Sequence, residues 1–472
     1  MDPRSPLLDQ AQSDGPWDVL VIGGGASGLA TAWDAASRGY HTALIEKHDF
    51  AEATSSRSTK LIHGGVRYLQ KGEISLVREA LAERSRLLKN APEFCHPLRF
   101  VLPTDAPLAR YYYRFGLWLY DLMAGDQSVQ PAELLSSDDV RKTLAGYNAT
   151  DNRGGVSYTD AQFDDAALAI AMAQCINASS NGLAINHTEA TRFITENDQV
   201  RGVEARCTES GKSWSMLAKV VINATGIFSD EVRKANSTSI QWKMQTSRGS
   251  HIVCPGHLLE SDHGLIIPKT SDGRILFAIP WLGHTLIGTT DEPTDQPELD
   301  PQPSEAELDF LFKEAGQAFH LDPNTVTSQW AGLRPLVSKA GVSNTAKLSR
   351  KHIVEIAPNG LISLLGGKWT TSRAMAEDTI DAAIKQQMLP PKPCRTADLK
   401  LTDHGALPPF LQPDKSATPE ELAAIARNAI ETTYARKPDD VLKRRLRIGM
   451  LNDQLAQQWQ PHITSGFASL EK

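Results

Sequence analysis

The stretch from Asp18 to Lys47, DVLVIGGGASGLATAWDAASRGYHTALIEK, decides the fold of this chain. It opens with an apolar run, residues 19–22, that has the length and composition of a buried β-strand. Gly23, Gly25 and Gly28 follow with the spacing G-x-G-x-x-G. In this pattern the first glycine permits a tight turn, the second lets the backbone approach a pyrophosphate, and the third lets the next helix pack closely on the sheet.

The residues after the glycines complete a strand–helix–strand unit. An Ala-rich helix is predicted over Leu29–Arg38 and should end at Gly39, and a second strand is predicted over His41–Ile45. That strand ends at Glu46, at roughly the spacing of about 20 residues expected for an acid that accepts from a ribose hydroxyl. The unit predicts a bound dinucleotide at the start of the helix. The residues expected to contact it are Gly23, Gly25, Ala26, Ser27, Gly28, Glu46 and Lys47.

Composition narrows the class of protein. With 472 residues, 41% of them hydrophobic, the chain can bury a large core in two or three domains. The net charge of -7 gives no global sign of nucleic-acid binding. The five cysteines are scattered without a C-x-x-C pair, which favours reduced thiols and predicts no disulfide framework and no metal site. We find neither a secretory signal nor a spanning segment, and residues 1–16 are expected to be a disordered tail.

A donor-rich segment, residues 51–73, follows the nucleotide unit. Its small hydroxyl residues can donate to phosphate oxygens, and its His-Gly-Gly turn lets the backbone come close to a flat or charged group. An arginine and a tyrosine come next. The residues singled out in this segment are Thr54, Ser55, Ser56, His63, Gly64, Gly65, Arg67 and Tyr68.

The block GGGASG followed by TSSRSTKLIHGGVRYL resembles the FAD-dependent glycerol-3-phosphate dehydrogenases, which have a D-amino-acid-oxidase-like flavoprotein fold. The blocks IPW…IGTTD, GGKWTT and ARKPDDVLKRRLRIGMLND extend this resemblance over most of the chain. It implies an α/β protein. A glutathione-reductase-like FAD-binding Rossmann domain should be interleaved with an antiparallel-sheet substrate domain over residues 17–389. A helical C-terminal domain, abbreviated relative to the family, should occupy residues 390–472.

The resemblance also assigns residues. The turn after VVINATG should lie against the dinucleotide, and the turn GGKWTT should bring a helix N-terminus to the isoalloxazine, where its partial positive charge stabilises reduced flavin. The cofactor contacts implied by these two turns are Ala224, Thr225, Gly226, Gly367, Lys368 and Thr370.

The implied activity is oxidation of sn-glycerol 3-phosphate to dihydroxyacetone phosphate by hydride transfer to FAD, with the electrons passed to a membrane quinone of the respiratory chain. Arginine suits the phosphate because its planar fork makes bidentate bonds. The substrate contacts implied are Arg67, Tyr68, Arg334, Arg350 and Lys368. Among the catalytic candidates, which also include Arg67 and Arg334, either His63 or His251 takes the hydroxyl proton.

Three alternatives to this reading stay open. Oxygen can replace the quinone as acceptor, the same fold can oxidise another hydroxy or amino acid, and a flavin-binding chain can serve as a sensor without catalysis. The paired arginines favour a dianionic phosphate, and the intact polar residues argue against a sensor. A homodimer is compatible with each of these activities.

The aromatic stretch within Pro107–Met123 suits either a membrane interface or a packed core helix. A competing membrane contact is the basic cluster Lys443, Arg444, Arg445 and Arg447. A quinone acceptor would place the protein in the cytoplasm, peripherally attached to the inner face of the cell membrane.

Overall fold

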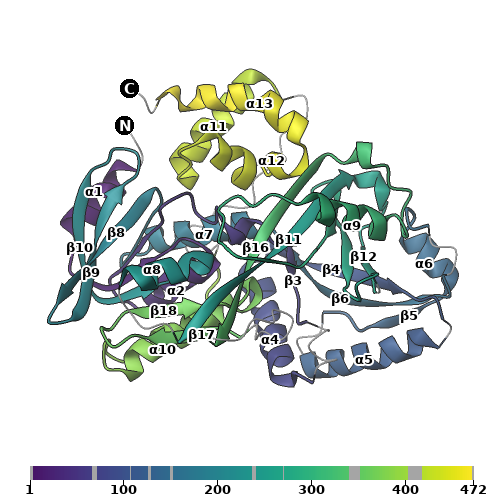
Figure 1. Cartoon of the computed structure of the whole chain (residues 1–472), viewed down its shortest axis with the longest axis horizontal. Helices are drawn as coiled ribbons and strands as arrows, with labels where there is room; N and C mark the ends of the chain where they lie inside the picture. Colours follow the sequence, from purple (N-terminus) through teal and green to yellow (C-terminus); the bar gives the residue numbers. More distant parts are fainter. Residues whose placement is uncertain are drawn as a thin grey trace.

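Two β-sheets form the centre of the chain, and C-terminal helices pack beside them (Figure 1). The structure is a computed structural model. It describes residues 4–65, 72–106, 108–125, 129–148, 152–236, 241–268, 270–339, 351–401 and 417–469. The arrangement confirms the predicted α/β fold, with one mainly parallel and one mainly antiparallel sheet.

The first sheet has the strand order β17-β18-β10-β1-β2-β7. All of these strands run parallel except β17. Their bounds are β1 Trp17–Ile22, β2 Thr42–Ile45, β7 Gly182–Ile185, β10 Ser213–Asn223, β17 Ile353–Ile356 and β18 Ile362–Leu365. The strand–helix–strand prediction for residues 18–47 is therefore confirmed.

From the sequence, residues 213–216 and 220–226 are interpreted as two separate strands, but the structure joins them in the single strand β10. Its first half pairs antiparallel with β9 (Gln199–Cys207), which in turn pairs with β8 (Thr188–Glu196). From Ala218 onward it pairs in parallel with β1. Alternating burial in the first half and continuous burial in the second make one strand look like two in the sequence.

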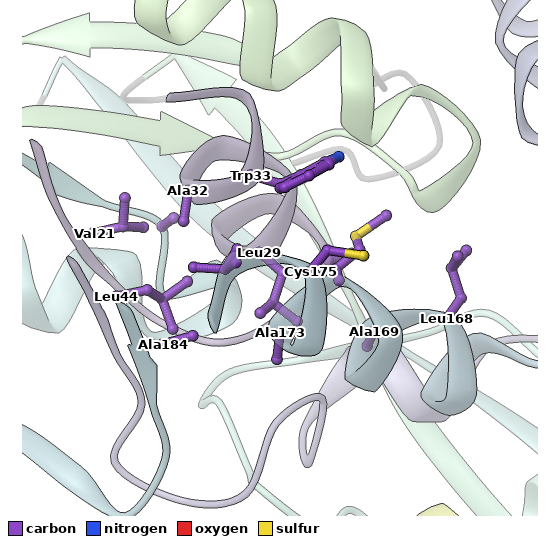
Figure 2. Close-up of a cluster of buried hydrophobic side chains, with 14 of the residues drawn as sticks. Val21, Leu29, Ala32, Trp33, Leu44, Leu168, Ala169, Ala173, Cys175 and Ala184 are labelled. Carbon is purple, nitrogen blue, oxygen red and sulfur yellow. The ribbon is translucent and has the colours of Figure 1, made fainter. Parts of the chain in front are cut away.

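Helices α2 (Ala26–Ser37) and α7 (Asp165–Ala178) pack against each other (Figure 2). Both helices contribute buried alanines, including Ala32 and Ala173, to one core cluster, and such small side chains let neighbouring elements approach closely. Leu29 and Leu44 fill the space between α2 and the sheet. The sequence offers Asp164 or Asp165 as the cap of α7, and the structure shows Asp164 in this role, accepting from the amides of the second and third residues that follow it. Helix α10 (Ser372–Lys385) packs along α2.

The second sheet has the order β15-β11-β14-β13-β12-β4-β6-β3, with β16 paired to β11 and β5 to β6. The aromatic and β-branched content of residues 275–291 predicts two antiparallel strands around a turn at residues 282–284, and the structure confirms them as β13 and β14. The bounds are β3 Leu61–Ile62, β4 Cys95–Pro103, β5 Glu133–Leu135, β6 Gly155–Phe163, β11 Trp242–Pro255, β12 Gly264–Ile267, β13 Leu276–Trp281, β14 His284–Gly288, β15 Glu292–Thr294 and β16 Ser328–Lys339. The helices around this sheet are α4 Ile74–Asn90, α5 Ala109–Ala124, α6 Ser137–Thr143 and α9 Glu305–Ala315, and α8 Ser229–Ala235 follows β10.

The N-terminal segment is ordered where the structure describes it, which corrects the expectation of a disordered tail. Residues Ser5–Ser13 form helix α1. Arg4 is 2% exposed and pairs with Glu209 at 2.7 Å. It also donates to the carbonyl oxygens of Asn186 and His187. A buried arginine with this many acceptors ties the segment to the first sheet.

The C-terminal helices also differ in part from the prediction. The sequence predicts a helix over residues 418–434 with Thr418 as its cap, and the structure confirms this as α11 (Pro419–Thr433), which Thr418 caps. The sequence also predicts a single helix over residues 438–453. The structure instead shows a π-helical turn, η9 (Asp440–Arg445), followed by α12 (Ile448–Leu451) and α13 (Asp453–Gly466). The left-handed φ of +62° at Arg447 separates the first two.

The alternative in which the basic cluster contacts the membrane is wrong. Arg444, Arg445 and Arg447 are at most 2% exposed, and all three form ion pairs with buried carboxylates. Lys443 alone of the four retains a partly exposed side chain, at 30%. Separately, none of the helices in the described ranges combines the length and hydropathy needed to cross a bilayer.

Candidate functional site

The candidate site lies at the carboxyl ends of the parallel strands of the first sheet. The glycine turn follows β1, Glu46 follows β2, residues 224–226 follow β10, and the turn 366–368 follows β18. The chain runs from β1 to its neighbour β2 on one side, whereas β10 is followed in this sheet by β18 on the other side, so the edge between β1 and β10 is a topological switch point. Ligands of open α/β sheets bind at such points.

Each of the three glycines of the turn is required for a different structural reason. Gly23 has a left-handed φ of +110°, and a Cβ there would lie 2.7 Å from the carbonyl oxygen of Ala224. A Cβ on Gly28 would lie 1.9 Å from the carbonyl oxygen of Gly23. A Cβ on Gly25, in contrast, would meet just the Ser55 hydroxyl, at 3.0 Å, among the described atoms. Gly25 therefore faces open space at the N-terminus of α2, which fits a pyrophosphate cradle.

Glu46 is held by two backbone amides. Its carboxylate accepts from Gly24 N at 2.6 Å and from His48 N at 2.8 Å. Burial raises the pKa of Glu46, against the effect of these two amides. Each oxygen keeps a further acceptor position, which suits a ribose hydroxyl. The neighbouring Lys47 is half exposed and pairs with Glu189 on β8 at 2.9 Å.

The segment of residues 54–60 joins three parts of the chain. Ser55 Oγ accepts from Ala26 N at 2.9 Å, and Ser55 O accepts from Trp369 Nε1 at 2.8 Å. Thr54 donates to Leu333 O on β16 at 2.7 Å. These contacts bring the glycine turn, the donor-rich segment and the GGKWTT turn to one site, as the resemblance implied.

A buried ion cluster lies beneath this segment. Asp165 accepts from Lys60 Nζ at 2.7 Å and from Arg447 at 2.6 Å, and all three side chains are fully buried. Ser58 also donates to Asp165 at 2.7 Å, and Ser56 O accepts from both cations. Burial, together with the charge of Arg447, lowers the pKa of Lys60 to about 7. The cluster fixes the segment that carries Thr54 and Ser55.

His251 lies on β11 and faces the same segment. Its ring stacks on Trp330 with centroids 4.2 Å apart, and its Nε2 shares a 3.0 Å hydrogen bond with the Thr59 hydroxyl. Burial, followed by the charges of Lys60 and Arg334, holds the pKa of His251 well below its usual value. The ring is therefore neutral at physiological pH.

Arg334 on β16 is fixed by acceptors that follow β14. It donates to Thr289 Oγ1 at 3.0 Å, to Thr290 O at 2.9 Å and to Asp291 at 3.1 Å. A Cβ on Gly249 would lie 2.4 Å from its guanidinium, so the close approach of β11 requires glycine there. The side chain remains 26% exposed. It thus combines a fixed orientation with access to solvent.

The structure places the remaining predicted residues as follows. His63 is half-buried, and Gly64 and Gly65 are buried after strand β3. Lys368 and Thr370 follow the left-handed Gly367 at the start of α10. The predicted substrate contacts Arg67, Tyr68 and Arg350 lie outside the described residues.

Sequence reasoning missed several residues that shape the site. Thr289, Thr290 and Asp291 hold Arg334, and Trp330 and Trp369 contact other site residues. The signal available was their position in the blocks IGTTD, WAGLRPLV and GGKWTT. Lys60, Asp165 and Arg447 give no local signal, because their roles depend on long-range pairing.

One described group of side chains has metal-ligand spacing: Asp49, His187 and Asp440, with ligand atoms within 4.8 Å of one another. The carboxylates there already pair with guanidinium groups. Arg444 binds both of them and Arg445 binds Asp49. Two buried positive charges oppose a metal cation, so we interpret this cluster as the ionic contact between the first sheet and η9.

Comparison with known proteins defines the class. The family described as FAD dependent oxidoreductase matches residues 18–381. This chain belongs to that family, and FAD is its cofactor. The open cradle at Gly25, the fixed Glu46 carboxylate and the free space beside Gly226, where a Cβ would meet no described atom within 4 Å, fit this group.

Particular relatives point to one branch of the family. The chain is 41% identical to the mitochondrial glycerol-3-phosphate dehydrogenase of Rattus norvegicus over 93% of its own length, and 41% identical to that of Arabidopsis thaliana over 84%. It spans 62% and 65% of the length of these two relatives. A solved structure of glycerol-3-phosphate dehydrogenase from Bacillus halodurans complexed with FAD aligns with a TM-score of 0.77 at 25% identity, covering 99% of this chain and 93% of that one.

Proposed function

We propose that this chain oxidises sn-glycerol 3-phosphate to dihydroxyacetone phosphate. The observation that carries the proposal is Arg334, held in a fixed orientation yet accessible, in a chain whose relatives are named for this substrate. A planar guanidinium presents a bidentate donor pair to phosphate oxygens. FAD supplies the two-electron acceptor when bound, and the glycine turn, Glu46 and Ser55 would hold it.

Proton transfer is assigned to His63. An imidazole whose pKa lies well below its usual value is a weak base, which disfavours His251 for this step. His251 instead shares a hydrogen bond with Thr59 and so places a neutral hydrogen-bonding group on strand β11 of the second sheet. His63 follows strand β3 directly, and in the sequence it precedes the proposed substrate contacts Arg67 and Tyr68 by four and five residues.

Anaerobic reduction tests the function directly. Glycerol 3-phosphate should bleach the flavin absorbance of the purified protein, whereas glycerol and glycine at the same concentration should not. Bleaching by an amino acid in place of glycerol 3-phosphate would favour the amino-acid oxidase alternative. Failure of every substrate to bleach a fully loaded protein would favour a binding role without catalysis.

Replacing Arg334 with lysine should raise KM for glycerol 3-phosphate about ten- to a hundredfold. Lysine keeps the charge but loses the fork, and a hydrogen bond to a charged group contributes roughly 1.5–3 kcal/mol. Steady-state kinetics measures the change. Arg274→Lys is the matched control, because Arg274 lies between Asp272 and Glu292 near the surface of the same sheet. Equal KM values for Arg334→Lys and wild type would move the phosphate site elsewhere.

The proposed electron acceptor is a membrane quinone, reached by peripheral binding through helix α5. The outer face of this helix carries large apolar side chains that are 47–79% exposed: Leu108, Tyr111, Tyr112, Phe115, Trp118 and Leu122. Of the two alternatives for this stretch, a helix with all its rings packed in the core does not fit these exposures, although Leu117 and Tyr120 on the opposite face are buried. Amphipathic rings beside Arg110 and Arg114 suit an anionic lipid surface.

The double variant Tyr112→Ser/Trp118→Ser should lose binding to vesicles that contain anionic lipid and should slow reduction of a lipid-soluble quinone. Both rings are exposed, so stability and anaerobic flavin reduction should change little. Vesicle co-sedimentation and thermal unfolding measure the two effects. Unchanged vesicle binding by the folded double variant would exclude α5 as the contact, and rapid turnover with oxygen alone would favour the oxidase alternative.

A further inference from the structure

A buried hydrogen-bonded group connects helix α5 to the His63-Gly64-Gly65 turn. The Gly64 amide donates to the Tyr120 hydroxyl at 2.8 Å, and that hydroxyl donates to Asp160 at 2.8 Å. The Gly64 amide also approaches Asp160, at 3.3 Å. Tyr120 and Asp160 are each 1% exposed, so water cannot replace these bonds.

Asp160 on β6 is itself held by a cation. Arg84 on α4, also 1% exposed, donates to Asp160 at 2.6 Å and to Thr159 O at 3.2 Å. The guanidinium lies 6.0 Å from the centre of the Tyr120 ring. Helices α4 and α5 and strand β6 thus meet at one carboxylate, and the oxygen that accepts from Arg84 and Tyr120 also faces the Gly64 amide.

The turn is shaped to fit this group. A Cβ on Gly64 would lie 2.3 Å from the Tyr120 hydroxyl and 2.6 Å from Leu81, so no larger residue fits without a shift. Burial raises the pKa of Tyr120 well above its usual value, so the phenol keeps its proton and stays a donor to Asp160. Because its proton is donated to Asp160, the phenol oxygen acts as the acceptor for the Gly64 amide.

We infer that Tyr120 is a positioning residue for the His63-Gly64-Gly65 turn. It sets the direction in which the chain leaves β3, and with it the place of the His63 imidazole. Neither Tyr120 nor Asp160 carries a sequence motif for this role, because the bond joins residues 56 positions apart. The inference rests on the proposed function in assigning proton transfer to His63.

Tyr120→Phe tests the inference with the loss of one oxygen atom. The Asp160–Arg84 pair stays intact, and the phenyl ring still fills its place in the core. We expect exchange of the Gly64 amide with deuterium to speed up about tenfold, since a buried hydrogen bond contributes roughly 0.5–1.5 kcal/mol. We also expect kcat for glycerol 3-phosphate to fall about tenfold or more, with bound FAD unchanged.

Tyr158→Phe is the matched control. Its ring packs edge-on against Tyr120 with centroids 6.3 Å apart, but it takes no part in the bonds from Gly64 to Arg84 described above. It should leave both the Gly64 exchange rate and kcat near wild type. The inference is overturned if Tyr120→Phe exchanges Gly64 at the wild-type rate. It is also overturned if exchange speeds up and kcat does not fall.

The two proposals fail in different ways. If wild-type protein loaded with FAD is not bleached by glycerol 3-phosphate, the proposed function fails. The exchange measurement needs no substrate, so it still decides whether Tyr120 holds the turn. If wild type is active and both tyrosine variants lose the same activity, general loosening of the core explains the loss and the specific role of Tyr120 is rejected.

Discussion

Gly25→Val is expected to give a folded, colourless protein. Gly25 has φ -84° and ψ -176°, a conformation open to any residue. Its added side chain would displace just the Ser55 hydroxyl and would otherwise enter the space in front of the α2 amides. Hydrogen bonds to a charged group contribute roughly 1.5–3 kcal/mol each, so losing two weakens FAD binding about a hundredfold or more.

Two measurements check this result. Flavin absorbance per mole of protein should be near zero, and added FAD should raise the thermal midpoint of wild type but not of the variant, because a ligand stabilises the state it binds. Gly28→Val is an instructive contrast. Its Cβ would lie 1.9 Å from a backbone oxygen, so it should fail to fold at all. Full flavin occupancy in Gly25→Val would place the pyrophosphate outside this turn.

Asp165→Asn is expected to lower the free energy of unfolding by about 3–5 kcal/mol, as removal of one partner from a buried ion group does. The substitution leaves the fully buried Lys60 and Arg447 side chains without their shared carboxylate. The protein should also bind FAD more weakly, because Ser58 and the segment it belongs to lose their anchor.

Urea unfolding at saturating FAD measures this loss. Asp398→Asn is the matched control, since Asp398 pairs with Lys89 at the surface and such pairs contribute about 0–1 kcal/mol. Burial opposes ionisation of Asp165, but the charges of Lys60 and Arg447 hold its pKa below the ordinary 3.8. Its contribution is therefore present above pH 3.8 and lost as pH falls through the lower, folded-state pKa. A variant as stable as wild type at neutral pH would contradict this account.

The parts of the fold that sequence predicted are those set by local periodicity. Residues 18–47 contain their own strands, turn and helix, and the hairpin within residues 275–291 contains its own turn. Thr418 caps a helix through its bond to the Glu421 amide three residues on. Each of these signals lies within a few residues of the structure it produces.

The parts that sequence did not predict depend on distant partners. Burial of Arg445 depends on Asp49, 396 positions earlier, and without that pairing a run of basic residues looks like a surface patch. The N-terminal segment is ordered because Arg4 donates to a backbone acceptor far along the chain, the carbonyl oxygen of His187. The segment 289–291 acquires its role from Arg334 on a strand that pairs elsewhere. The hydrophobic periodicity of a sequence cannot predict contacts between residues that are so far apart in the chain.

The pairing of Asp165 with Arg447 bears on the order of events during synthesis of the chain. The two residues are 282 positions apart, and Trp369 reaches Ser55 across 314. The glycine turn leaves the ribosome early. The segment of residues 54–60 that contacts it cannot form its bonds to Arg447 and Trp369 until almost the whole chain has emerged. Domains generally form from the N-terminal side as translation proceeds. We therefore expect nascent chains arrested before residue 447 to hold FAD loosely, and the flavin to be secured only at the end of translation.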